Sequence, residues 1–185
     1  LHQIELPGVH TDEAMEVLPA MQLLRGQPVE CYKDVCLNLF GLRLPVMIYE
    51  YIAAVNAYLV LPFFALLGIN VPALRALPIA QSGVALVFVY LFGREFLNQR
   101  VAVVALLLLA VNPSFVFWSR QGVFVTIVTV PLTIVGLWAL WRWVQRRQSG
   151  YLYLAAFLFG LAVSAKLLSW WIIAGIGGAA FFLNL

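Results

Sequence analysis

The sequence predicts an all-α fold, a polytopic transmembrane helix bundle with an outer loop that carries juxtamembrane helices. Of its 185 residues, 64% are hydrophobic and only 10% are charged, and its mean hydropathy is +0.96. Soluble domains have about 45–50% apolar and about 25% charged residues, so this chain has too little polar surface to face water on all sides. Its longer apolar stretches also approach the ~20 residues that cross a bilayer.

The composition excludes several other classes of protein. Aliphatic and aromatic residues dominate, which excludes a disordered chain, and two cysteines are too few for a disulfide-framework mini-protein. The formal net charge is +3 and the arginines are scattered along the chain, so nucleic acid is not an expected partner. The chain opens at Leu1 without a Met and stops inside an apolar stretch, and we interpret it as an internal piece of a longer polytopic protein.

Residues 1–44 are predicted to form an outer acidic loop with a short surface helix. Most acidic side chains, both histidines and both cysteines lie in this region. Thr11 is the predicted helix N-cap, because two acidic residues follow it in the first turn, and the helix is expected to end before Gly26. Cys31 and Cys36 either form a disulfide, if this loop lies in an oxidising compartment, or remain reduced.

Residues 45–68 are predicted to form a juxtamembrane or re-entrant amphipathic helix on the outer face. Glu50, Asn56 and three tyrosines interrupt its apolar residues, and polar groups of this kind are costly at membrane depth. In the alternative interpretation this stretch spans the membrane. The acidic loop and the basic loops described below would then lie on one side.

Residues 72–185 are predicted to form a transmembrane helix bundle of about five spans, the last one truncated. Helix-breaking residues separate its apolar stretches. These stretches are 76–93, 101–118, 121–141, 151–166 and 168–185. Several are shorter than a usual span, so they need a thin bilayer or shielding by protein at their ends.

The charges of two short loops predict the orientation of the bundle. Residues 94–100 and 142–147 are the most basic loops, and the positive-inside rule places both in the cytoplasm. Two spans separate these loops, so the two placements agree. The acidic loop and the span ends near Arg75, Arg120 and Lys166 then lie on the non-cytoplasmic side of a plasma or inner membrane.

This topology gathers polar side chains that suit a group-transfer reaction. An adjacent acid pair, Asp12 and Glu13, faces three cations, Arg75, Arg120 and Lys166. One carboxylate can take a proton from an acceptor hydroxyl while cations stabilise an anionic leaving group. Sugar transfer from a lipid phosphate has this form, and arginine binds phosphate in a bidentate way.

Six motifs in order carry a resemblance to a known family. They are His10–Ala14, the Pro- and Tyr-containing segment Pro45–Gly68, Arg75, Gly93-Arg94 with Arg100, Asn112-Pro113 with Ser119-Arg120, and Gly160–Ala162 with Lys166. With these motifs the chain resembles the GT-C class of polyprenyl-phosphate-sugar-dependent glycosyltransferases. Within that class it is similar to the protein O-mannosyltransferase and aminoarabinose transferase group, over nearly its whole length.

The resemblance implies a membrane glycosyltransferase that moves a sugar from a polyprenyl-phosphate donor to an acceptor hydroxyl on the non-cytoplasmic face. Asp12 matches the position of the catalytic base, and Glu13 is its electrostatic or metal-binding neighbour. Arg75, Arg120 and Lys166 match cationic positions near the donor phosphate. The expected partners are this lipid-linked donor, the lipid bilayer and other membrane subunits.

A divalent metal ion is a candidate cofactor, with His10 and Glu13 as its candidate ligands. A complete site needs further ligands that the sequence does not identify. Aminoarabinose transferases carry a Glu-Lys pair just before the proline of the amphipathic segment. Here residues 41–45 read Gly-Leu-Arg-Leu-Pro, so the metal site tied to that pair and the aminoarabinose specificity are not implied.

Each of these residues also has an ordinary structural interpretation. Acidic residues in a first helical turn stabilise the helix by ~0.3–1 kcal/mol, cations at span ends reach to the lipid headgroups, and the tryptophans near span ends fit an aromatic belt. The alternative function is a non-catalytic, glycosyltransferase-like subunit of a larger membrane complex. A transporter ranks last, because the sequence has no convincing internal repeat.

Overall fold

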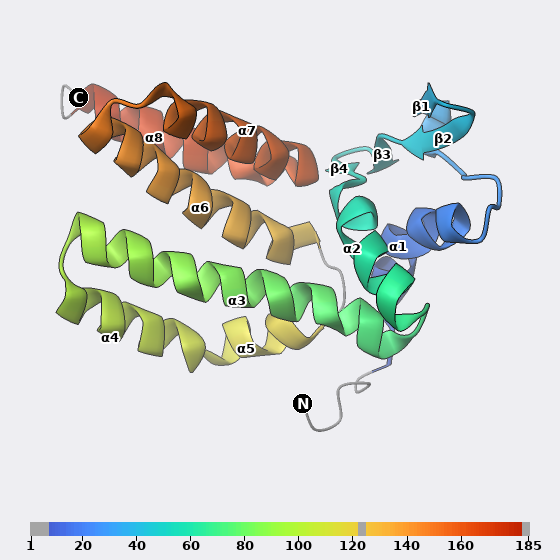
Figure 1. Cartoon of the computed structure of the whole chain (residues 1–185), viewed down its shortest axis with the longest axis horizontal. Helices are drawn as coiled ribbons and strands as arrows, with labels where there is room; N and C mark the ends of the chain where they lie inside the picture. The colour runs from blue at the N-terminus through green and yellow to red at the C-terminus, as the bar shows by residue number, and fades with distance from the viewer. Residues whose placement is uncertain (1–7, 122–124, 183–185) are drawn as a thin grey trace.

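The computed structural model describes residues 8–121 and 125–182 of the chain (Figure 1). Most of these residues are helical, and the only strands among them form two short hairpins. The helices α3 to α8 lie side by side as a bundle, and α1, α2 and the two hairpins form a smaller module at one end of it (Figure 1). The predicted all-α helical membrane bundle is therefore confirmed.

The first helix, α1, spans Thr11–Leu24. The predicted N-cap at Thr11 was wrong by one residue, since the N-cap is His10, whose imidazole accepts a hydrogen bond from a first-turn amide. Histidine can act in this way because its unprotonated ring nitrogen is an acceptor like the oxygens of the usual capping residues. The helix ends before Gly26, as predicted, and that glycine has a φ of 62°, which suits the end of a helix.

Two antiparallel hairpins, which were not predicted from the sequence, follow α1. Strand β1 (Cys36–Leu39) pairs with β2 (Leu42–Pro45), and β3 (Met47–Tyr49) pairs with β4 (Ile52–Ala53). The first hairpin turns at Phe40 and Gly41, both with positive φ, which is the backbone geometry of a tight two-residue hairpin.

The beginning of the predicted 45–68 helix was therefore wrong. The second hairpin takes its first residues, and helix α2 spans only Val55–Leu67. A short 3₁₀ helix, η1 (Tyr32–Asp34), precedes the hairpins, and Cys31 and Cys36 form a disulfide around it. Of the two alternatives for these cysteines, the structure has the disulfide.

The bundle contains one long helix after another, with short breaks. The elements are α3 (Val71–Phe96), α4 (Gln99–Ala110), α5 (Pro113–Arg120), α6 (Val125–Arg146), α7 (Ser149–Ala165), η2 (Leu167–Ser169) and α8 (Trp170–Phe182). Three of these helices begin at asparagine N-caps. Asn70, Asn98 and Asn112 each accept a hydrogen bond from the backbone amide three residues on, which satisfies an amide that the helix itself leaves unpaired.

By length and composition, α3 and α6 can each cross a membrane. The helices α4 and α5 pass the same test together but bend by 60° at their break, because Asn112 caps a new helix there. Among the described residues, α2, α7 and Leu167–Gly178 are apolar but shorter. About five spans, and the division of the chain at residues 44 and 68, therefore stay predictions.

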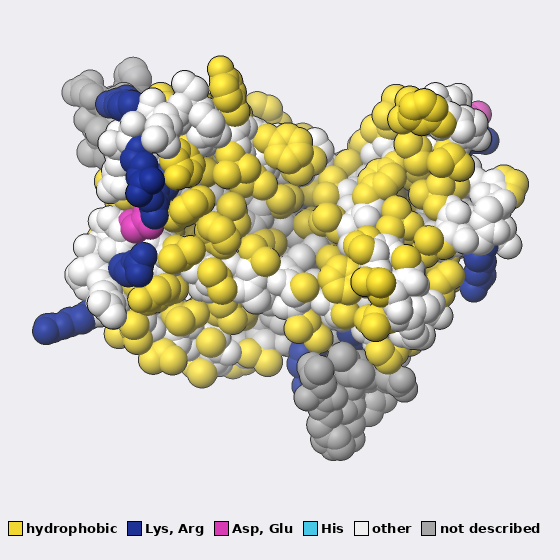
Figure 2. Space-filling view, in the orientation of Figure 1, with side chains coloured by type: hydrophobic (Ala, Val, Ile, Leu, Met, Phe, Trp, Pro, Cys, Tyr) yellow, Lys and Arg dark blue, Asp and Glu magenta, His cyan; other side chains and the backbone are white. Residues whose placement is uncertain are grey.

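The two basic loops lie at one end of the bundle, and the module of α1, α2 and the hairpins lies at the opposite end. Figure 2 shows basic side chains, all of them arginines, gathered at the end where α3 meets α4 and α6 meets α7. This arrangement agrees with the prediction that both basic loops face the same side. It also separates them from the acidic loop by the length of the bundle.

Two apolar clusters join the module to the bundle. The first is made of small and medium side chains from α1, α2 and the beginning of α3, such as Ala20, Val60 and Leu74. The second brings Ile52 of β4 against Val128 of α6 and Ala165 of α7. The N-terminal module is therefore packed onto the helix ends at which the candidate site residues lie.

The contact between α3 and α4 gives a direct test of the packing. A Cβ added to Gly93 would lie 3.2 Å from the backbone Cα of Ala102, whereas a Cβ added to Gly83 of the same helix meets nothing within 4 Å. We expect Gly93→Leu to lower the free energy of unfolding by about 1–3 kcal/mol, because the helices must move apart. Thermal unfolding in detergent measures this loss.

Gly83→Leu is the matched control, since it adds the same side chain to the same helix. It should leave the unfolding temperature unchanged or raise it, because leucine favours a helix more than glycine does. Equal losses in both variants would contradict the close packing of α3 on α4.

Candidate active site

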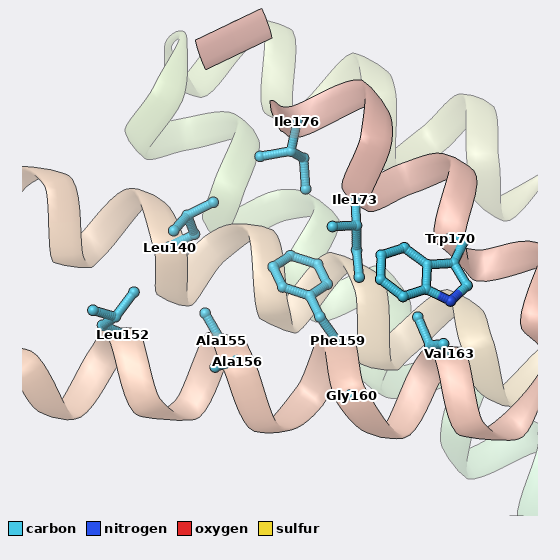
Figure 3. Close-up of a pocket in the computed structure, with 10 residues that line it drawn as sticks. All are labelled: Leu140, Leu152, Ala155, Ala156, Phe159, Gly160, Val163, Trp170, Ile173 and Ile176. Carbon is cyan, nitrogen blue, oxygen red and sulfur yellow. The ribbon is translucent and has the colours of Figure 1, made fainter. Parts of the chain in front are cut away.

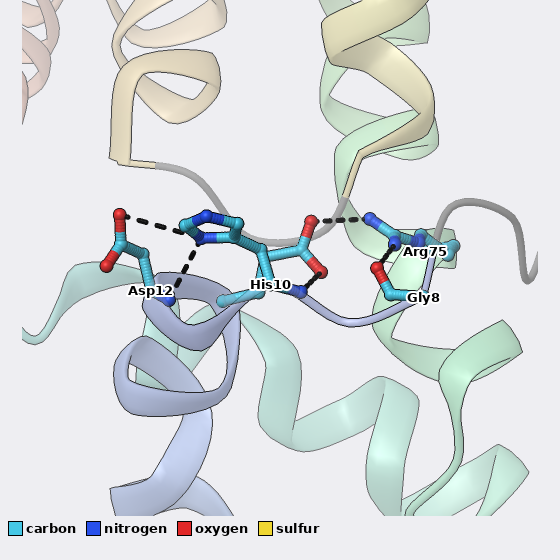
Figure 4. A network of polar contacts seen from close by, with 5 residues as sticks. Gly8, His10, Asp12 and Arg75 are labelled. Carbon is cyan, nitrogen blue, oxygen red and sulfur yellow. Dashed lines mark hydrogen bonds and ion pairs between the residues drawn. The ribbon is translucent and has the colours of Figure 1, made fainter.

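A buried ion pair joins the first turn of α1 to the first turns of α3. Arg75 Nη1 donates a hydrogen bond to Glu13 Oε1 at 2.6 Å, and both side chains are fully buried. Arg75 Nη2 also donates a hydrogen bond to the carbonyl oxygen of Gly8, at 3.4 Å (Figure 4). The guanidinium thus ties the start of α1, and the residues before it, to α3.

The second oxygen of Glu13 faces its own helix terminus. The backbone amide of His10 donates to Glu13 Oε2 at 3.3 Å, which completes a capping box at the start of α1. Burial raises the pKa of the Glu13 carboxyl, while the positive charge of Arg75 and the His10 amide oppose that rise. A carboxylate with these partners is held in one orientation.

Asp12 is the neighbour of this buried acid but points the other way. Its side chain is 60% exposed, and its backbone amide donates to Nδ1 of His10 at 3.3 Å (Figure 4). The Asp12 carboxylate lies 3.7 Å from the same ring nitrogen, which is too long for a hydrogen bond. The acid pair predicted from sequence therefore divides into one buried, ion-paired carboxylate and one exposed carboxylate.

A second set of buried polar contacts, which was not predicted from the sequence, joins α1, α2 and α3. Asn56 Nδ2 of α2 donates to Glu16 Oε2 of α1 at 3.0 Å, and Gln81 Nε2 of α3 lies 3.5 Å from Asn56 Oδ1. All three side chains are buried. The available signal was the presence of Asn56 and Gln81 within otherwise apolar stretches, because buried polar groups need partners.

Tyr49 links the acidic end of α1 to the bundle. It packs on the apolar cluster that contains Ala165, and it is close enough to Asp12 and Glu16 for their charges to act on it. Burial and these two carboxylates raise the pKa of the Tyr49 phenol. A hydroxyl that stays protonated beside an exposed carboxylate is a hydrogen-bond donor to a ligand or to water.

The two remaining predicted cations lie at helix ends. Arg120 is the exposed last residue of α5, and Lys166 is half-buried in the extended residue between α7 and η2. Both helix ends face the N-terminal module (Figure 1), and Lys166 directly follows Ala165, on which β4 packs. The structure therefore brings Asp12, Arg120 and Lys166 to one end of the bundle, while Arg75 is buried against Glu13.

Three of the possible donor atoms of the candidate metal ligands have other partners, namely His10 Nδ1 and both oxygens of Glu13. His10 and Glu13 serve the helix cap and the ion pair described above. Among residues 8–121 and 125–182, no three His, Cys, Asp or Glu side chains come together as metal ligands. Both oxygens of Glu13 are therefore engaged by other groups in this arrangement, and the metal site stays a prediction.

Cavities open between the bundle helices, and two of them, formed by described residues, bear on the site. One, of about 450 Å³, lies between α6, α7 and α8, and it extends from Leu140 and Leu152 to Trp170 with apolar side chains along its walls (Figure 3). The other, of about 480 Å³, lies at the bend between α4 and α5, where Asn112, Ser114 and Trp118 face α6. The first suits a hydrocarbon chain, and the second offers both polar and aromatic groups.

The comparison with known families is decisive for the bundle. A family model described as dolichyl-phosphate-mannose-protein mannosyltransferase matches residues 52–184. The chain belongs to this family. The match makes it a mannosyltransferase-like glycosyltransferase of membranes, as the resemblance implied.

The mannosyltransferase family match covers some candidate residues and not others. Arg75, Arg120 and Lys166 lie within it, whereas Asp12 and Glu13 precede its first residue. Neither a curated protein nor a solved structure matches the chain. The roles of the site residues therefore stay predictions, and the contacts described above are what supports them.

A double-mutant cycle tests the ion pair. We expect Arg75→Met to lower the free energy of unfolding by about 3–5 kcal/mol, because it leaves the Glu13 carboxylate buried without its cation. Glu13→Leu should cost a similar amount for the converse reason. The double variant should cost less than the sum of the two, since it removes both charges together, and reversible unfolding in mixed micelles measures all three.

The control for this cycle is the exposed ion pair of Arg43 with Asp34, at 2.7 Å. Removing either of its partners should change stability by no more than about 1 kcal/mol. Strictly additive losses at Glu13 and Arg75 would contradict a coupled pair.

Proposed function

We propose that this protein transfers a sugar from a polyprenyl-phosphate-linked donor to an acceptor hydroxyl on the non-cytoplasmic side of the membrane. In this proposal Asp12 is the general base, Glu13 is its electrostatic neighbour, and Arg120 and Lys166 bind the donor phosphate. Arg75 acts by holding Glu13. This last role replaces direct phosphate binding, because the guanidinium is buried against a carboxylate.

One observation carries the proposal, namely the division of the acid pair. Arg75 and the His10 amide hold the Glu13 carboxylate, so the preceding residue of the helix, Asp12, is directed outward with its side chain 60% exposed. A general base must reach the proton that it removes. The buried pair fixes the backbone that carries this base, which is the kind of support that an active site needs.

In the proposed step, the acceptor hydroxyl displaces the lipid phosphate from the sugar. The Asp12 carboxylate takes the proton of the acceptor hydroxyl, and the acceptor oxygen attacks the anomeric carbon of the sugar. The bond between that carbon and the phosphate oxygen breaks, and the lipid phosphate leaves as an anion. Positive charge from Arg120 and Lys166 stabilises the leaving phosphate as its charge develops.

The apolar cavity beside α8 supports a lipid-linked donor. Trp170, at one end of this cavity, is four residues beyond Lys166 along the chain. A donor whose phosphate lies at Lys166 could extend its hydrocarbon chain along the walls of the cavity. The burial of that chain would contribute binding energy at about 0.8 kcal/mol for each CH₂ group.

The test is sugar transfer by the purified full-length protein in proteoliposomes, with a panel of radiolabelled polyprenyl-phosphate sugars. We expect one donor to be consumed, and Asp12→Asn to reduce its turnover by about 10²- to 10⁴-fold, because the amide cannot accept the proton. The thermal unfolding temperature of the variant should match that of the unaltered protein, since the Asp12 side chain is exposed.

Asp34→Asn is the matched control. Asp34 is also an exposed aspartate of the N-terminal module, but it lies in η1, away from the α1 terminus. Turnover should be unchanged in this variant. Full activity in Asp12→Asn would contradict the base assignment, and consumption of no donor by folded protein would favour the alternative of a non-catalytic subunit in a larger membrane complex.

A further inference from the structure

The opposite end of the bundle carries a surface that the transfer reaction does not use. We define the basic end as Arg94, Arg100, Arg142, Arg146 and Arg147, together with Glu95. Its five arginines against one glutamate give a formal charge of +4, so the six other cations and seven other carboxylates of the chain give −1. Figure 2 shows this basic cluster with a single acidic patch beside it.

The one carboxylate of the basic end is already neutralised. Glu95 is largely buried and forms an ion pair with Arg142, and Trp138 Nε1 lies 3.4 Å from the same oxygen. Among residues 8–121 and 125–182, no ion pair involves Arg94, Arg100, Arg146 or Arg147. These four exposed guanidinium groups therefore present uncompensated charge.

Aromatic rings hold two of these guanidinium groups near the helix ends. Arg94 lies 5.6 Å from the centre of the Tyr90 ring, and Arg147 lies 5.6 Å from that of Trp143. Arg147 also has a φ of 56°, so the chain turns sharply there. Arginines stacked on tyrosine and tryptophan at span ends are typical of the level of the lipid headgroups.

The basic end is polar at its rim and apolar directly beneath it. A surface hollow of about 840 Å³ is lined by Asn98, Gln99, Arg100 and Val103. Val103 itself and two chain neighbours of the lining residues, Leu97 and Val104, are more than a third exposed. A ligand that fits this surface carries an anion at one end and hydrocarbon at the other.

We propose that the basic end binds the headgroup of an anionic phospholipid, with the phosphate among the guanidinium groups and the acyl chains along α4. A free phosphate would use only the charges and leave the apolar residues exposed. Guanidinium groups suit a phosphate because they donate parallel hydrogen bonds to its oxygens. This inference does not depend on the proposed glycosyl transfer.

The test compares lipids added to the purified full-length protein in detergent, with the unfolding temperature as the readout. Phosphatidylglycerol should raise this temperature, whereas phosphatidylcholine and inorganic phosphate should raise it much less. The triple variant Arg94→Gln, Arg100→Gln, Arg147→Gln should bind phosphatidylglycerol at least about tenfold more weakly, since each basic residue near an anionic surface contributes on the order of 1 kcal/mol.

The matched control removes the same charge from the other end of the molecule, with Arg25→Gln, Lys33→Gln and Arg43→Gln. Its affinity for phosphatidylglycerol should equal that of the unaltered protein. The salt dependence of phosphatidylglycerol binding by the unaltered protein is a second test. High salt should weaken this binding, because salt screens exposed charges. Equal effects of the two phospholipids, equal effects of inorganic phosphate, equal losses in the control, or binding that salt does not change would each overturn the proposal.

Discussion

The ion pair between Glu13 and Arg75 is the constraint on which the N-terminal half of the structure depends. Taking both charges out of water costs several kcal/mol for each ion, and only close contact between them offsets that cost. The pair can form only where α1 meets the beginning of α3, so it selects one position for α1. Apolar packing alone, through small side chains such as Ala20 and Ala57, would leave that position less well specified.

Further contacts of α1 follow from that position. The capping box at His10 uses the second oxygen of Glu13, and Glu16, one turn along, meets Asn56 of α2. The buried face of the first turns is therefore fixed by polar contacts, while the exposed side carries Asp12. A helix end held in this way gives the neighbouring carboxylate a defined place without burying it.

The sequence predicted the bundle better than it predicted the module. Asn70 and Asn112 lie in helix-breaking runs that are visible in the sequence, because cap residues act within three or four positions of the chain. The family resemblance also reached the correct class, since its motifs are local. The hairpins before α2 were missed because their strands are two to four residues long, and short apolar runs of this kind do not distinguish a strand from a helix.

The ion pair between Glu13 and Arg75 could not be predicted from the sequence, for a different reason. Each residue was assigned a ligand of its own, a metal or a phosphate, because no local pattern shows that two residues so far apart share a contact. The burial of Gln81 beside Asn56 could not be predicted for the same reason, because the two residues are far apart in the sequence. Long-range pairing is a property of the packed chain, and a single sequence carries no direct signal of it.

The distance between these two partners has a consequence for biosynthesis. They are 62 residues apart, and ribosomes add about 5–20 residues each second. The first turn of α1 is therefore synthesised several seconds before Arg75. The ion pair cannot form until Arg75 has left the ribosome. The start of α1, which carries Asp12, can therefore reach its final position only after the first long helix of the bundle, α3, has begun to form.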